Sequence, residues 1–137
     1  MTFWVYMLFV GDHSHGNNRK IYTGYTKHLM QRITQHIGLS NTKGARLTRK
    51  QPIELVYLEK FQSRKKAIQR ENQFKKQNPY NQKKHKLALI REFQIENGPI
   101  LKEINEKLIE YFEFLNTLIK NMITAERELK EKLNSVL

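Results

Sequence analysis

The spacing of apolar residues changes several times along the chain, and this limits the folds open to it. Residues 3–10 are a continuous apolar run rich in aromatic and β-branched side chains, which is typical of a buried strand. Residues 27–38 instead carry Leu29, Ile33 and Ile37 at every fourth position, as one face of a helix does. A strand-like pattern returns over residues 53–61. Such alternation predicts an α+β fold.

We expect a small three-stranded antiparallel sheet flanked by helices. Its strands would cover about residues 3–10, 19–25 and 53–61, with the first two paired as a hairpin. Ser63 is a suitable N-cap for a helix over about 64–77, and a basic helix is expected over about 80–93. The segment Asn97-Gly98-Pro99 then predicts a break, with Pro99 in the first turn of a new helix.

Residues 99–137 have a heptad pattern. Counted from Leu101, ten of the eleven a and d positions are apolar, which predicts a long coiled-coil-like helix. We expect a homodimer joined through residues 99–137. A partner helix, or one long helix folded back onto its own domain, would explain the same pattern. The chain therefore divides into a domain at 1–95 and a helical segment at 99–137.

Positive charge is concentrated in the first part of the chain. The net charge is +12, and residues 1–98 carry 19 Lys and Arg against six Asp and Glu, whereas residues 99–137 carry six against seven. A small domain with this excess attracts polyanions, and nucleic acid is the commonest of them. A basic, solvated face with no partner is the alternative.

Composition excludes several other classes of protein. The chain has no cysteine, which excludes disulfide scaffolds, zinc fingers with Cys ligands and thiol nucleophiles. Its longest uncharged apolar run, residues 2–11, is well short of the roughly 20 residues that span a bilayer. No basic segment precedes that run as in a signal peptide. We expect no membrane partner and a cytoplasmic protein, with nucleoid-associated or nuclear access left open.

Glu71 is an unusual residue in this basic region. On a helix it lies beside Ala67, Ile68 and Phe74, so its carboxylate is at the edge of an apolar stripe. Burying a charge is costly unless a cation pairs with it, and a metal ion or an arginine would serve. An ordinary helical ion pair with Lys75, four residues later, is the alternative.

Two further groups of residues could carry chemistry. Arg32 and His36 are four residues apart on one helix face, where an arginine can grip a phosphate and a histidine can move a proton. Tyr6 and Tyr22 lie on the hairpin strands, and Gly24 shares a strand face with Tyr22. A glycine inside a strand often marks a close approach. Exposed polar residues and core tyrosines would be the structural explanations.

Six segments occur in a characteristic order over about residues 3–90. Residues 4–8 read Trp-Val-Tyr-Met-Leu, and residues 21–26 read Ile-Tyr-Thr-Gly-Tyr-Thr. Residues 29–36 have the pattern Leu-x-x-Arg-x-x-x-His, and residues 43–49 read Lys-Gly-Ala-Arg-Leu-Thr-Arg. The strand segment 52–57 and the glutamate helix 67–76 follow. Together they resemble the GIY-YIG nuclease superfamily, most closely its compact stand-alone branch related to Slx-type structure-specific endonucleases.

The resemblance implies that the protein is an endonuclease that hydrolyses phosphodiester bonds with one divalent cation, Mg²⁺ or Mn²⁺. Glu71 would be the metal ligand, and Arg32 would hold the phosphate oxygens as charge develops. Tyr6 or Tyr22 would orient or deprotonate the attacking water, and His36 would take the proton. The residues alone leave open which tyrosine is the base.

Basic side chains would grip the nucleic-acid backbone, which we expect to be DNA. They fall in a loop and at a helix start: Lys43, Arg46, Arg49, Lys50, Arg64, Lys65 and Lys66. No helix-turn-helix or zinc finger accompanies them, so recognition by shape or single-strandedness is expected. A catalytically silent nucleic-acid-binding module with a coiled-coil tail is the main alternative. A coiled-coil adaptor with a basic head is the third.

Overall fold

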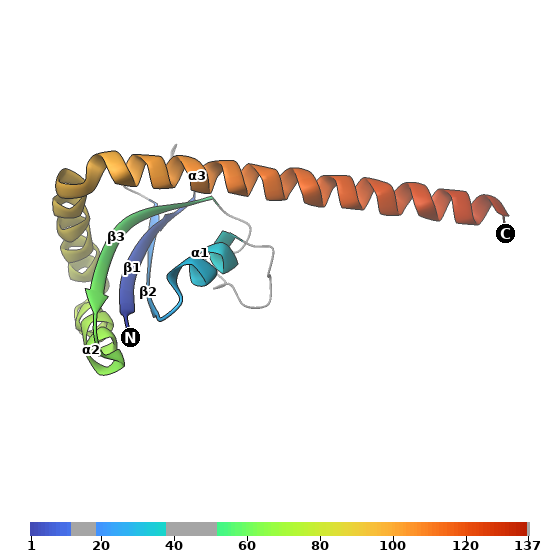
Figure 1. Ribbon diagram of the computed structural model, residues 1–137. Helices are drawn as coiled ribbons and strands as arrows, with labels where there is room; N and C mark the ends of the chain where they lie inside the picture. Colours follow the sequence, from blue (N-terminus) through green and yellow to red (C-terminus); the bar gives the residue numbers. More distant parts are fainter. Residues whose placement is uncertain (12–18, 38–51, 137) are drawn as a thin grey trace.

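The structure, a computed structural model, describes residues 1–11, 19–37 and 52–136 (Figure 1). Its elements in order are β1 (Phe3–Val10), β2 (Lys20–Thr26), α1 (Leu29–Ile37), β3 (Ile53–Phe61), α2 (Arg64–Lys75) and α3 (Pro79–Val136). The predicted α+β class, the three-stranded antiparallel sheet and the long C-terminal helix are all confirmed. The second strand begins and ends one residue later than expected.

The central strand of the sheet is β1, and this accounts for its unbroken apolar sequence. The strand order is β2-β1-β3, and both pairings are antiparallel. On one side Tyr6 pairs with Gly24, and on the other it pairs with Leu58. The register with β3 shifts between Met7 and Leu8, so Val56 is the extra residue of a β-bulge.

Helices cover both faces of the sheet. On the first face, Tyr6 and Leu8 of β1 share a core with Ile33 of α1 and with Leu101 and Leu115 from the second half of α3. The opposite face packs on α2 and the first half of α3, through Met7, Phe9, Phe74 and Ile90. Because side chains alternate along a strand, neighbouring β1 residues belong to different cores.

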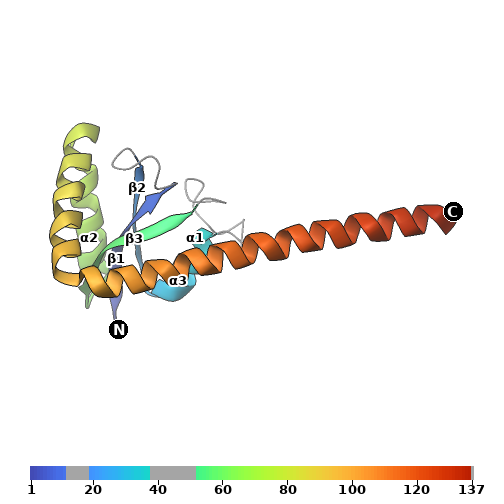
Figure 2. The same ribbon diagram turned by 90° about the horizontal axis from the view of Figure 1, so that it is seen from above.

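A kink lets α3 serve both faces. The predicted break at residues 97–99 is a kink within one helix, where Asn97 has non-helical angles (φ −126°, ψ 19°). Pro99 lacks a backbone N–H, which weakens the helix at this point, and the Asn97 side chain donates to the Phe93 carbonyl at 3.2 Å. Phe93 contacts both cores, because α3 turns around the β3 side of the sheet there (Figures 1 and 2).

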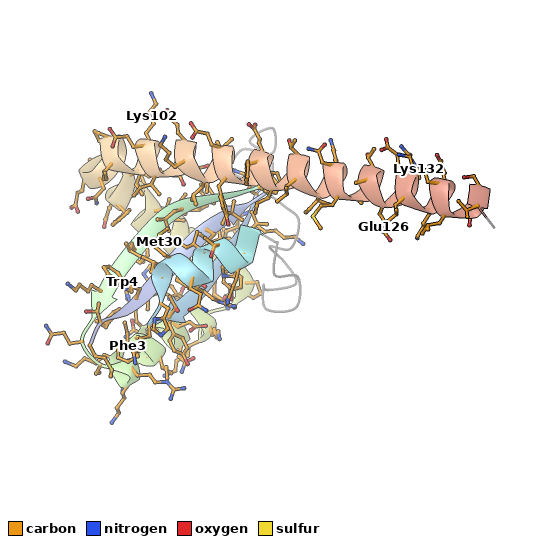
Figure 3. All side chains as sticks on the ribbon, turned by 45° about the vertical axis from the view of Figure 1, so that its right-hand side comes forward. Phe3, Trp4, Met30, Lys102, Glu126 and Lys132 are labelled. Atoms are coloured by element: carbon orange, nitrogen blue, oxygen red, sulfur yellow. The ribbon has the colours of Figure 1, made fainter. Side chains whose placement is uncertain are left out.

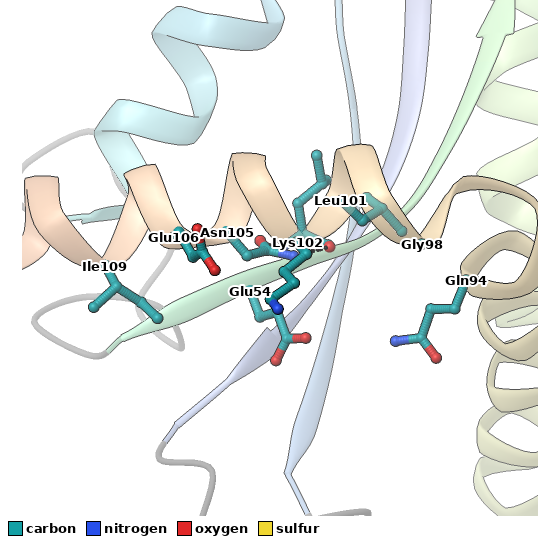
Figure 4. A pocket seen from close by; sticks show the side chains of 9 residues that line it. Glu54, Gln94, Gly98, Leu101, Lys102, Asn105, Glu106 and Ile109 are labelled. Atoms are coloured by element: carbon teal, nitrogen blue, oxygen red, sulfur yellow. Dashed lines mark hydrogen bonds between the residues drawn. The ribbon is translucent and has the colours of Figure 1, made fainter.

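Asn105 attaches the second half of α3 to β3. Its side chain accepts from the Leu55 backbone N–H at 2.7 Å and donates to the Leu55 carbonyl at 2.9 Å. These are the bonds that a neighbouring strand would make, so Asn105 satisfies part of the sheet edge. A cavity of about 360 Å³ lies beside it between α3 and β3, with Glu54 and Lys102 in its lining (Figure 4).

Only the first part of the C-terminal segment packs on the sheet. Leu101, Ile104, Leu108, Phe112 and Leu115 pack on the sheet. The 3.6-residue period of a straight helix places Phe112 on the face that packs on the sheet. Strict heptad counting would place Tyr111 on that face, but Tyr111 is 37% exposed. Residues 101–115 therefore fold back onto their own domain.

Beyond Leu115, α3 projects past the sheet, and no other described element lies beside it (Figures 1 and 2). Glu126 and Lys132 both lie on this projecting part (Figure 3). Met122 is 63% exposed and Leu129 is 58% exposed. Of the helices described, none has a stretch long and apolar enough to cross a membrane.

Candidate active site

Four of the predicted residues meet on the α1 face of the sheet. Tyr6 comes from β1, Tyr22 from β2, and Arg32 and His36 from successive turns of α1. The rings of Tyr6 and Tyr22 are 6.1 Å apart between centroids, and those of Tyr22 and His36 are 4.6 Å apart. We call these four residues the tyrosine–arginine cluster.

Gly24 makes room for Tyr6. A Cβ atom added to Gly24 would lie 2.6 Å from the Tyr6 hydroxyl and 3.0 Å from Cε1 of Tyr22. Real Cβ atoms do not make contacts of 2.6 Å, so a side chain at this position would displace Tyr6. Gly24, in the segment 21–26, is therefore required by Tyr6 of the segment 4–8.

The buried centre of the cluster is a hydrogen bond between Tyr6 and His36. The Tyr6 hydroxyl lies 2.8 Å from His36 Nε2, and both residues are fully buried. Burial raises the pKa of Tyr6. Burial, with the nearby Arg32 charge, lowers the pKa of His36 to about 4. At neutral pH Tyr6 therefore keeps its proton and His36 is uncharged, so the hydroxyl donates and Nε2 accepts.

Arg32 connects both tyrosines. Burial lowers its pKa, but hydrogen bonds to Tyr22 and Tyr6 outweigh burial, and the net pKa is raised. The guanidinium therefore stays charged and donates to both hydroxyls. It also donates to Gln35 Oε1 at 3.2 Å, a neighbour three residues along α1.

Exposure divides the cluster into an inner and an outer pair. Tyr6 and His36 have no accessible surface, whereas Tyr22 and Arg32 are half-buried. A molecule arriving from solvent would thus meet a phenol hydroxyl and a guanidinium held together. An anion with several oxygens, such as a phosphate, fits this pair.

The structure places Glu71 away from this cluster. It lies on α2, on the opposite face of the sheet, and its carboxylate is 3.0 Å from Lys75 Nζ. Lys86 is a further charged neighbour of the Glu71 carboxylate. The structure thus shows the helical ion pair with Lys75 that was the alternative.

The chemistry of Glu71 nevertheless suits a divalent cation. The side chain is only 13% exposed, and the partner Lys75 is 65% exposed. Mg²⁺ sites commonly use one or two carboxylates and complete their shell with water and phosphate. In the parts of the chain that the structure describes, no three or more His, Cys, Asp or Glu residues form a metal-holding group. As a largely buried carboxylate, Glu71 is chemically suited to such a site.

The predicted nucleic-acid contacts fall into two sets. Arg64, Lys65 and Lys66 form the first turn of α2, and all three are exposed. The other four, Lys43, Arg46, Arg49 and Lys50, lie outside the described residues.

Sequence reasoning missed a network that holds α2 against β3. Arg70 Nε donates to Glu59 Oε2 at 2.9 Å, and the Tyr57 hydroxyl donates to the same oxygen. Burial raises the pKa of Tyr57 to about 12, and the bond to Glu59 adds to the rise. The i, i+2 spacing of Tyr57 and Glu59 indicates a shared strand face. Only the packing of α2 reveals Arg70 as their partner.

Comparisons with known proteins found a matching family and several similar relatives. The model of the GIY-YIG catalytic domain matches residues 2–86. A UPF0213 protein of Pediococcus acidilactici is 33% identical over 65% of this chain and 81% of its own length. A UPF0213 protein of Clostridium perfringens is 37% identical over 74% of this chain and 97% of its own length.

One solved structure is also similar in sequence. The solution NMR structure of a UPF0213 protein from Bacillus halodurans shares 31% identity, over 64% of this chain and 83% of that one, with a TM-score of 0.37. The family match spans both strands of the hairpin, α1 and the Glu71 helix, which are the elements that carry the predicted site. The chain therefore belongs to the GIY-YIG family of nuclease domains.

Proposed function

We propose that the protein is a divalent-metal-dependent endonuclease that hydrolyses phosphodiester bonds in DNA. It would select its targets by shape or single-strandedness rather than by a long sequence. Family membership implies a nucleic-acid substrate. The observation that carries the proposal is the tyrosine–arginine cluster, which presents Arg32 and Tyr22 to solvent in a strongly basic domain.

Arg32 and Tyr22 would act directly on the substrate. The Arg32 guanidinium would hold the non-bridging phosphate oxygens and stabilise the charge that builds on them. Tyr22, which accepts a hydrogen bond from Arg32, would orient the attacking water. We assign this role to Tyr22 rather than Tyr6, because Tyr6 is fully buried.

Tyr6 and His36 would support the outer pair. Tyr6 donates to His36 and accepts from Arg32, so its oxygen helps to fix the guanidinium. The neutral His36 ring packs against Tyr22 and holds it in place. Both residues are positioning residues in this scheme.

Glu71 would hold the cation. Its exposed partner Lys75 can leave at small cost, because surface ion pairs contribute only about 0–1 kcal/mol. A divalent ion bound there would supply electrostatic stabilisation of the leaving oxygen. The cluster and Glu71 lie on opposite faces of the sheet, so a substrate would reach both only around the edge strand β2, which α2 also contacts.

Basic residues outside the cluster would hold the nucleic-acid strand. Arg64, Lys65 and Lys66 occupy the first turn of α2, and no acidic residue accompanies them. Cations at a helix N-terminus oppose the helix dipole, at a cost of a few tenths of a kcal/mol each. A bound phosphate would remove this cost. The segment with Lys43, Arg46, Arg49 and Lys50 would add further phosphate contacts.

A cleavage assay tests the proposal. Labelled single-stranded, duplex and branched DNA of one sequence are incubated with the protein, with Mg²⁺ or Mn²⁺ and with chelator. We expect metal-dependent cleavage that Glu71→Gln abolishes and that Arg32→Ala slows by about 10²–10³, the usual cost of one lost charge-stabilising donor. Arg91→Ala, an exposed arginine on α3, is the matched control.

The runner-up is a catalytically silent nucleic-acid-binding module. The observation in its favour is the ion pair of Glu71 with Lys75, which occupies the expected metal ligand. Tight DNA binding without cleavage under either metal would favour this silent binding module. Undiminished cleavage by Glu71→Gln would instead exclude Glu71 as the metal ligand.

We further propose that the projecting part of α3, residues 118–136, joins two copies of the chain. Its large apolar residues are exposed: Leu118, Met122, Ile123, Leu129, Leu133 and Val136. A contiguous apolar stripe of this kind commonly marks an interaction surface. Dimerisation would place two nuclease domains on one nucleic acid and increase avidity. If the helix instead binds a different protein, this segment would act as the coiled-coil adaptor considered above.

A further inference from the structure

A cavity of about 310 Å³ lies between the start of β2 and the start of α3. Its lining residues are Lys20, Ile21, Pro79, Gln82, Lys83 and Lys86. Half of these are lysines, and they come from two elements about 60 residues apart in the sequence. We call this site the lysine cavity.

Positive charge in the lysine cavity exceeds the nearby negative charge. Among the described residues, no acidic side chain lines it. Glu71 attracts Lys86 from outside the lining, but the same carboxylate is already paired with Lys75. Lys20 and Lys83 are exposed and point charges of this kind bind phosphate readily.

Lys86 is the most buried of the three lysines. It is half-buried above the Phe74 ring, with Nζ 5.8 Å from the ring centre. Burial, and then the repulsion from Lys75, lower its pKa, against the attraction of Glu71. Burial deprives the Lys86 ammonium of part of its hydration, and an anion in the cavity would compensate its charge.

We propose that the lysine cavity binds a backbone phosphate of the nucleic-acid strand, on the Glu71 side of β2. This inference rests on the proposed nuclease function and names a part of its substrate path. Lys20 and Ile21 immediately precede Tyr22 in β2, and Lys86 is a neighbour of Glu71. The lysine cavity thus lies near the proposed metal ligand, on the face of the sheet that carries Ile21, whereas Tyr22 lies on the other face of β2.

Other features of the cavity agree with a backbone phosphate. Ile21 and Pro79 provide apolar walls suited to a sugar rather than to a fully hydrated ion. The Gln82 amide is committed to the Gln77 and Lys75 carbonyls, so the lysines are left as the groups that select the ligand. Contacts from lysine to phosphate carry no sequence information, which agrees with recognition by shape.

Binding of labelled single-stranded DNA, measured by fluorescence anisotropy over a salt series without divalent cations, tests the proposal. Lys83→Ala and Lys20→Ala/Lys83→Ala are compared with Lys84→Ala and Lys84→Ala/Lys120→Ala, which remove the same charge from exposed positions outside the cavity. We expect each cavity lysine to cost about fivefold in affinity at 0.1 M salt and about 0.7 in the salt slope, because one counterion contact fewer is released from the single strand. The control variants should change affinity by less than twofold.

The controls distinguish the ways in which the proposal can fail. Equal losses in cavity and control variants would show diffuse charge attraction and overturn the lysine cavity. A wild-type protein that binds no nucleic acid would overturn the proposed function as well. Wild-type cleavage and binding that the cavity variants leave unchanged would overturn the cavity alone.

A second arm separates the strand from a free ion. Inorganic phosphate is titrated into the wild type and each variant, and the thermal unfolding midpoint is measured at each concentration. The midpoint without phosphate confirms that each variant is folded. If phosphate stabilises the wild type but not Lys83→Ala, while DNA affinity is the same in both, the cavity is a free-anion site and the strand proposal is wrong.

Discussion

Tyr6 shows how the fold imposes its demands on single residues. A buried hydroxyl and a buried imidazole are costly unless each finds a partner, and here they satisfy one another. The same Tyr6 side chain lies directly over Gly24, so three positions from three elements depend on one another. Tyr6 and Gly24 are thus explained by packing as well as by chemistry.

The contact between Tyr6 and Gly24 gives the first prediction. Gly24→Ala should destabilise the protein by about 1–3 kcal/mol, the usual cost of overpacking, because the new Cβ would lie 2.6 Å from the Tyr6 hydroxyl. It should also lower cleavage, since Tyr6 helps to fix Arg32. Gly98→Ala is the matched control, because nothing lies within 4 Å of a Cβ there. Urea unfolding measures both variants.

The control should be neutral or stabilise the helix by up to about 0.5–1 kcal/mol. Equal unfolding free energies for Gly24→Ala and Gly98→Ala would contradict the close packing of Tyr6 on the strand.

His36 gives a pH prediction. Its pKa is lowered to about 4 in the folded protein, whereas an unfolded histidine has a pKa near 6.5. The unfolded chain therefore binds the proton first, and stability present above about pH 6.5 is lost as pH falls towards 4. The integrated loss is about 3 kcal/mol. Urea unfolding at several pH values measures it.

His36→Gln is the comparison variant, because glutamine can accept from Tyr6 but does not titrate in this range. The stability difference between wild type and variant should shrink as pH falls from 6.5 to 4. A difference that stays constant over this range would mean that His36 does not titrate as the structure indicates.

At the scale of elements, α3 is held by specific bonds as well as by apolar contacts. Asn105 pairs with the backbone of Leu55 next to the bulge at Val56. The attachment fixes the second half of α3 on the first face of the sheet, where Leu101 and Leu115 complete the core. A single helix therefore closes the sheet edge and covers its face.

Asn105→Asp tests this attachment. Aspartate has nearly the same shape, but it cannot donate to the Leu55 carbonyl, and its charge would face that oxygen. We expect a loss of about 1–3 kcal/mol in unfolding free energy. Asn121→Asp, at an exposed position of the same helix, makes the same chemical change and should have little effect. Similar losses for both would argue against the attachment.

At the scale of the whole molecule, α3 joins two regions with different surroundings. Residues 101–115 are part of the domain core, so removing all of 99–137 would uncover the sheet. The oligomerisation proposal concerns only residues 118–136, which lie beyond the core (Figure 2). A truncation test must end the chain after residue 117.

The shortened chain, residues 1–117, should be a folded monomer that still cleaves DNA but binds it more weakly. Full-length protein should be a dimer at micromolar concentration. Light scattering measures both masses, and thermal unfolding confirms that the core survives. A monomeric full-length protein would disprove the dimer, and a dimeric shortened chain would locate the interface elsewhere.

Short-range patterns in the sequence were sufficient for the strands, for α1 and for the faces that carry the tyrosines. A strand alternates every two residues and a helix repeats every 3.6, so neighbours such as Arg32 and His36 are fixed by local geometry. The six family segments then indicated a nuclease domain. The break near Pro99 was also predicted, because a proline disrupts a helix locally.

Contacts between distant elements were decided only by the tertiary structure. Tyr6 meets His36 across 30 residues, and Asn105 meets Leu55 across 50. The same is true of Arg70 with Glu59 and of the lysine cavity. Residue spacing fixes which face a side chain occupies, but its partner depends on how helices pack on the sheet. That packing is set by the summed burial of many side chains, which no local pattern contains.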